Sequence, residues 1–274
     1  SLDNKEKDFV FSDLKTTDKE RIISVLKKSG ETIAISQKNG LTIAEILNQI
    51  EKSKARKLNN DKLLFHALSF KTSLLVAIAI NLIFQLPLST SIVNILLIEL
   101  IANIPLQLSL RHEINNEQPN KKIGQKNYIH ILLNCAISGL IVSTIYLLSL
   151  LSYGFVFFEE NSISATAINT AQTLTLITLI TIQIFNFYNA RDLNNSIFKR
   201  DKITKIEPHM VSLIVILLFY ITLKINNYNQ YFEIQQVTIS QIEAIVFLCS
   251  SIILIEELRK KLNKSNHSNG TKNS

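Results

Sequence analysis

The sequence predicts a mainly α-helical membrane protein, with a six-helix transmembrane bundle and a short α/β segment on the cytoplasmic side. Hydrophobic residues form 47% of the 274 residues, and the mean hydropathy is +0.21. Several apolar runs are long enough, at about 18 residues or more, to cross a bilayer as helices. Lys and Arg are concentrated in alternate connections between these runs, which is typical of polytopic membrane proteins.

The polar N-terminal region, residues 1–60, is predicted to be a cytoplasmic α/β segment followed by a linking helix. Residues 9–11 read as a short strand, Asp18 can cap a helix, and residues 31–36 alternate as a second strand. This order is that of a βαβ unit, which needs further chain or a partner to cover both faces of its sheet. Residues 41–62 then predict an amphipathic, increasingly basic helix that leads into the membrane.

Six segments are predicted to span the membrane and to form one transmembrane domain over residues 61–262. They are residues 64–86, 91–110, 129–152, 168–190, 209–226 and 239–256. Residues 263–274 are predicted to be a disordered tail. Lys and Arg are frequent in the connections 111–128 and 191–208, whereas 153–167 contains none. The positive-inside rule therefore places both termini of this multi-pass cell-membrane protein in the cytoplasm.

The formal net charge of +7 comes largely from these connections and from the tail. The basic residues do not gather on one soluble face beside stacking aromatic residues, so no nucleic-acid partner is expected. The expected partner is the lipid bilayer. No two histidines have metal-ligand spacing, and His66, near the start of the first span, is expected at the membrane interface.

The second span contains a carboxylate, an amide and a proline in an otherwise apolar stretch, LLIELIANIPLQL. Glu99 and Asn103 are four residues apart and therefore lie on one helix face. Pro105 leaves the carbonyl of Ile101 without its helical donor. These oxygen atoms are the ligands that hard cations prefer, which predicts an inorganic cation site. The alternative is a polar contact between helices together with a proline kink.

Four segments resemble parts of one family, and they occur along the chain in the same order as in that family. LPLSTSIVNILLIELIANIPLQLSL (86–110) resembles P-type cation-transporting ATPases from the end of their fifth membrane helix through the sixth. AQTLTLITLITIQIFNFYNARDLNNSIFK (171–199) resembles their eighth helix, and EELRKKL (256–262) the exit of the tenth. VFSDLKTTDKERIISVLKKSGETIAI (10–35) resembles part of their phosphorylation domain. The resemblance implies helices five to ten of the calcium-pump-like class, after the remnant of a phosphorylation domain.

The catalytic motifs of that family are replaced or missing. Where the family has T-G-D-G-V-N-D, this chain reads SQKNGLT, and the two aspartate positions are Lys38 and Thr42. Lys cannot ligate magnesium, and Thr offers no carboxylate. The D-K-T-G-T phosphorylation motif is also missing from the 274 residues. The chain alone is therefore expected to bind no cofactor and to hydrolyse no ATP; Mg²⁺ and ATP are expected only in a complete pump.

The resemblance also implies which residues line the membrane ion pathway. The fifth-helix ligand position falls on Lys71, sixth-helix positions on Glu99 and Asn103, and the eighth-helix position on Gln183. The hypothesis is that Lys71 pairs with Glu99 at the centre of the bundle, because the pair avoids two isolated buried charges. The alternative is that Lys71 titrates within a proton or monovalent-ion path.

Two functions from different classes follow. The first is the transmembrane transport domain of a P-type cation ATPase that is truncated, split or degenerate and acts with an upstream pump segment. The second is a non-catalytic membrane subunit that binds a partner transporter, in which the polar residues only hold helices together. An unrelated secondary transporter is disfavoured, because the spans show no internal repeat.

Overall fold

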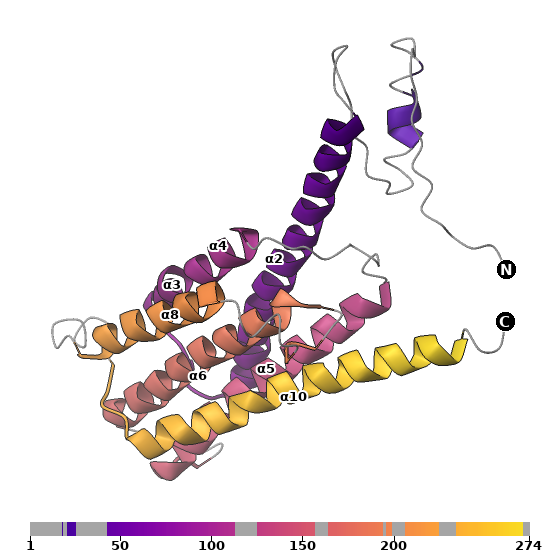
Figure 1. Cartoon of the computed structure of the whole chain (residues 1–274). Coiled ribbons are helices and arrows are strands. Elements are labelled where there is room, and N and C mark those ends of the chain that lie inside the picture. Colours follow the sequence, from indigo (N-terminus) through magenta and orange to yellow (C-terminus); the bar gives the residue numbers. More distant parts are fainter. Residues whose placement is uncertain are drawn as a thin grey trace.

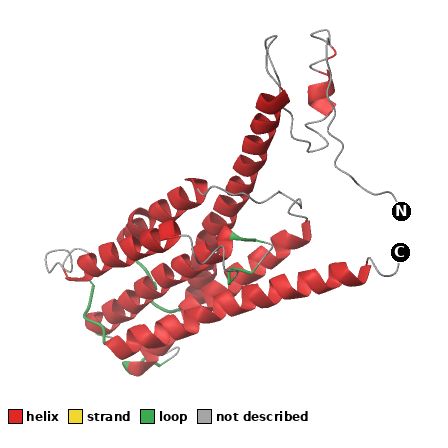
Figure 2. Ribbon diagram, in the orientation of Figure 1, coloured by secondary structure: helices red, strands yellow, loops and turns green. Residues whose placement is uncertain are grey.

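The computed structural model describes residues 18, 21–25, 43–112, 125–156, 164–193, 196–198, 206–224 and 234–270. Within these residues the regular structure is helical and no strand is present (Figure 2), which confirms the mainly α fold class. Residues 21–25 are helical, as predicted. The two predicted strands, together with Lys38 and Thr42, lie outside the described residues.

Six helical segments among the described residues are long and apolar enough to span a membrane, as the sequence predicts. They are Ala55–Ile83, Ile92–His112, Leu133–Ser152, Ala165–Arg191, Ile206–Lys224 and Ile239–Leu262. The first belongs to α2 (Ile43–Ile83), which joins the predicted linking helix and the first span without a break. The last belongs to α10 (Ile239–Gly270), which continues as a helix into the segment predicted to be a disordered tail.

Local signals explain why the helix ends differ from the predicted ends by a few residues. Helix α2 ends at Ile83 because Gln85 adopts a left-handed backbone conformation, with a φ of 53°. The N–H of Leu86 then donates to the carbonyl of Asn81 at 2.8 Å, which closes the end of the helix. Helix α6 (Ala165–Arg191) begins three residues before the predicted 168, because the Ser164 hydroxyl accepts from the Ala167 N–H at 3.2 Å.

The remaining helices are α3 (Ile92–Ile98), the π-helical turn η1 (Glu99–Asn103), α4 (Ile104–His112), α5 (Gln125–Ser152) and α8 (Ile206–Lys224). Figure 1 shows α6 between α8 on one side and α10 on the other. Helix α6 is the most enclosed span, with 67% of its apolar window buried against 22% for α8 and for α10. The core of the bundle is therefore built around α6.

Helices α2 and α5 pack closely at Gly139. A Cβ atom at this position would lie 2.6 Å from Val76 Cβ and 2.8 Å from the Ser73 carbonyl oxygen, so the contact needs a glycine. Small residues at helix contacts let two backbones approach, which is how membrane helices gain packing energy without a hydrophobic driving force. This contact fixes α2, the helix that carries Lys71, against α5.

Candidate functional site

The second span is continuous but changes its winding where the polar residues lie. The π-turn η1 covers Glu99–Asn103, and the Ile104 N–H donates to the Glu99 carbonyl instead of to the residue four positions earlier. Pro105 follows directly and has no N–H to donate. The proline is therefore accommodated by a π-turn, a distortion that is frequent at functional sites.

Lys71, Glu99 and Asn103 form one hydrogen-bonded group, which we call the edge triad. The Lys71 ammonium forms an ion pair with Glu99 Oε1, and Asn103 Nδ2 donates to Glu99 Oε2 at 3.0 Å. Glu99 is the single carboxylate of the second span. Both of its oxygen atoms are therefore engaged by donors from within the chain.

The Lys71–Glu99 contact that the sequence predicts is present, but it does not lie at the centre of the bundle. The Lys71 side chain is 58% exposed and that of Glu99 is 26% exposed. Lys71 follows Phe70, which is fully buried. One further residue turns the side chain by about 100°, so Lys71 points away from the core face of α2. The pair therefore lies at the edge of the described bundle.

Gln183, the fourth predicted site residue, lies apart from the edge triad. It is fully buried on α6, and among the described residues its side-chain nitrogen and oxygen have no hydrogen-bond partner. Its main-chain carbonyl lies 3.3 Å from His66 Nε2 on α2. The structure thus brings three of the four residues together and places the fourth in the core.

The expectation of an interfacial His66 is wrong, because the residue is fully buried in the core. Phe65, Ser69 and Ser73 are also buried on α2, at helical spacing from His66. This periodicity was the available signal, since it places His66 on the buried face of the first span. The His66 imidazole contacts the main chain of α6 at Gln183.

Sequence reasoning also missed a charged cluster where α6 ends beside α10, which we call the exit cluster. Arg259 Nη2 contacts Glu256 Oε1 at 2.5 Å and donates to the Leu193 carbonyl at 2.8 Å. Glu257 Oε1 accepts from Lys260 Nζ at 3.1 Å and from the Ile197 N–H at 3.0 Å. Glu256 and Lys260 are each only 2% exposed. The cluster therefore ties α10 to the chain that leaves α6.

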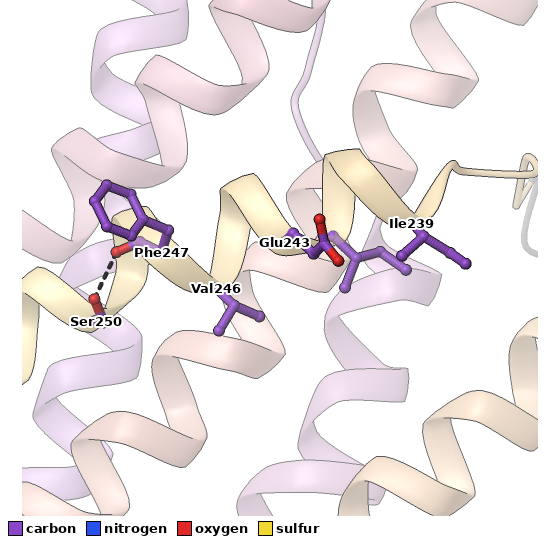
Figure 3. A pocket seen from close by; sticks show the side chains of 6 residues that line it. Ile239, Glu243, Val246, Phe247 and Ser250 are labelled. Atoms are coloured by element: carbon purple, nitrogen blue, oxygen red, sulfur yellow. Dashed lines mark hydrogen bonds between the residues drawn. The ribbon is translucent and has the colours of Figure 1, made fainter.

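The rest of the described part offers no second ion site. No group of three or more His, Cys, Asp or Glu side chains in the described part could hold a metal ion. A groove of about 490 Å³ runs along α10, lined by Ile239, Ile242, Glu243, Val246, Phe247 and Ser250 (Figure 3). Its lining is mostly apolar, and the Ser250 hydroxyl donates to the Phe247 carbonyl at 2.6 Å, so convergent ligands are lacking there.

The comparisons with known proteins agree with this architecture. The family model described as "Cation transporting ATPase, C-terminus" matches residues 85–262, which is well over half of the 274 residues. No curated protein matches the chain significantly. The matched range begins at the end of the first span and runs through the exit cluster. The chain therefore belongs to the family of C-terminal regions of cation-transporting ATPases.

Proposed function

We propose that this chain is the transmembrane transport domain of a P-type cation ATPase whose ion pathway carries its own ammonium group. The edge triad supports this proposal. In it, Lys71 pairs with the single carboxylate of the second span, and Asn103 donates to the other oxygen of that carboxylate. The four pathway residues are Lys71, Glu99, Asn103 and Gln183.

The chemistry of the triad disfavours a bound divalent cation. Such ions need several free oxygen ligands with net negative charge. Here the carboxylate charge is already balanced by Lys71, and a second cation beside the ammonium would meet electrostatic repulsion. We therefore infer that the cargo of this pathway is a proton or a monovalent cation.

We assign the binding and hydrolysis of ATP to another polypeptide segment. Lys38 and Thr42, at the positions where the family carries aspartates, provide no carboxylate for Mg²⁺, so the residues present do not fit the metal. The Mg²⁺- and ATP-binding domains would come from an upstream pump segment or from a partner subunit. The basic connections support an orientation with both termini in the cytoplasm, on the side where those domains act.

The charge balance at Lys71 provides the first test. Lys71→Asn frees the Glu99 carboxylate, and we expect the variant in lipid nanodiscs to bind Ca²⁺ at least about tenfold more tightly than the unsubstituted chain, a change of about 1.4 kcal/mol. Isothermal titration calorimetry measures this affinity. Lys52→Asn, at an exposed lysine of the same helix outside the first span, is the matched control. Equal affinities of Lys71→Asn and the unsubstituted chain would contradict the proposal.

Transport itself is tested in sealed vesicles that contain the chain with and without the upstream pump segment. We expect ATP-dependent proton or monovalent-cation flux only with that segment, and loss of the flux in Glu99→Gln. No flux with either composition would support the second candidate function, a non-catalytic subunit that binds a partner transporter. Stable co-purification with an intact transporter would then identify that role.

A further inference from the structure

Buried polar side chains divide α6 into two halves that satisfy their hydrogen bonds differently. In the first half the threonine hydroxyls donate to the carbonyl four residues earlier: Thr170, Thr173, Thr175, Thr178 and Thr181, at 2.7–2.9 Å. The donor hydrogen of each hydroxyl is therefore satisfied within the helix. The second half carries amides, whose longer side chains do not return to the helix in this way.

The three amides, Gln183, Asn186 and Asn189, follow one another at intervals of three residues. Each is fully buried, and each has both its side-chain oxygen and its side-chain nitrogen without a hydrogen-bond partner among the described residues. A step of three residues rotates the side chain by about 300°, so the three amides stay within an arc of about 120° on one side of the helix. At the inner end, His66 Nδ1 is also buried and without a described partner.

Buried amides are nearly always hydrogen-bonded, because an unpaired polar group costs its full desolvation energy. Each amide here offers an acceptor oxygen and two donor hydrogens. A cation would satisfy only the oxygens and would leave six N–H bonds unpaired. Water donates and accepts, and it commonly joins such groups in protein interiors.

We propose that Gln183, Asn186 and Asn189 hold a file of water molecules that extends from His66 to the end of α6. The file would end beside the exit cluster, where Arg191, Asp192 and Lys260 are charged residues at the end of the span. Arg259 on α10 donates to the carbonyl of Leu193, just after this end of α6. The path would connect the buried Gln183 with the aqueous side at which α6 ends. The proposal of a water file does not depend on the proposed transport function.

Cysteine accessibility in the full chain tests the file. In a background with Cys135→Ser and Cys249→Ala, single cysteines replace Gln183, Asn186 or Asn189, and Ag⁺ is added to the protein in nanodiscs. Ile177→Cys and Ile180→Cys are matched controls, because both native residues are buried apolar side chains of the same helix that lie outside the arc of the three amides. We expect modification at the amide positions at least about tenfold faster than at the controls, and fastest at Asn189→Cys.

The order of access sharpens the test. Adding Asn186→Leu should fill the file and slow the reaction at Gln183→Cys at least about tenfold, while the reaction at Asn189→Cys stays unchanged. Equal rates at amide and control positions, or no effect of Asn186→Leu, would overturn the proposal.

A measurement on the unsubstituted chain avoids variants that fail to fold. With ¹⁵N-labelled glutamine, the Gln183 side-chain amide should show magnetisation transfer from water, and its signal is assigned by its loss in Gln183→Leu. No transfer from water at this buried amide would also overturn the proposal.

Discussion

The edge triad and the exit cluster are both built on ion pairs, but they differ in burial and in the number of partners. The Lys71 side chain is 58% exposed and bonds to one carboxylate. In the exit cluster, Glu256 and Lys260 are 2% exposed, and Arg259 contacts both Glu256 and the Leu193 carbonyl. Charges in the cluster are thus largely removed from the surface, and Arg259 and Glu257 each contact more than one group.

This difference separates a structural role from a functional one. A buried ion pair is expensive to break, because the remaining charge loses its partner in a low-dielectric environment. The edge pair is less buried, and Glu99 keeps Asn103 as a second donor when Lys71 is lost, so breaking this pair should cost less. We therefore expect the exit cluster to determine how firmly α10 is held, and the edge triad to determine which ion is accepted. Three substitutions test this comparison, from the largest expected effect to the smallest.

Glu256→Gln should destabilise the protein most. The substitution leaves Arg259 without the carboxylate that it contacts at 2.5 Å, and we expect a loss of about 3–5 kcal/mol in the free energy of unfolding. Unfolding by SDS in mixed micelles, followed by circular dichroism, measures this loss. The double variant Glu256→Gln/Arg259→Gln should recover part of it, because no unpaired charge remains. A loss below about 1 kcal/mol would mean that the cluster behaves as a surface pair.

Gly139→Ala should have the second-largest effect. Its Cβ would lie 2.6 Å from Val76 Cβ and would force α2 and α5 apart, at a cost of about 1–3 kcal/mol in the same assay. Leu140→Ala, at the exposed neighbouring position, is the control and should change the free energy of unfolding by less than about 0.5 kcal/mol. Equal effects of the two variants would show that the α2–α5 contact is looser than the structure indicates.

Lys71→Met should affect stability least, although it removes a charged group of the ion pathway. We expect a smaller loss in the free energy of unfolding than for Glu256→Gln, because the pair is less buried and Asn103 still donates to Glu99. Its effect should appear instead in ion binding, as for Lys71→Asn. If Lys71→Met destabilises the protein as much as Glu256→Gln, the edge triad is a structural element and the comparison fails.

Much of the fold could be predicted because its signals are local. Six apolar runs separated by basic and neutral connections predict six spans, and all six are found. The ends of the spans were less predictable. The left-handed Gln85 that ends α2 and the Ser164 cap that starts α6 depend on backbone geometry, which composition does not report.

The candidate site was predictable in part. The resemblance to one family identified Lys71 and Glu99 as partners, and their ion pair is present. The depth of that pair and the separation of Gln183 from it were not predictable, whereas the helical periodicity of α2 could have indicated the burial of His66. Burial depends on which helices pack around a residue, and this sequence gives no direct information about those neighbours.

The sequence by itself determined the number, order and approximate limits of the membrane spans, because hydrophobic length is a property of each segment alone. It also determined which polar residues must lie at membrane depth. Only the tertiary structure decided that Lys71 and Glu99 lie at the edge, that three amides of α6 lie in the core, and that four charged residues of α10 close the end of the bundle. These outcomes depend on contacts between segments far apart in the chain, which local periodicity does not specify.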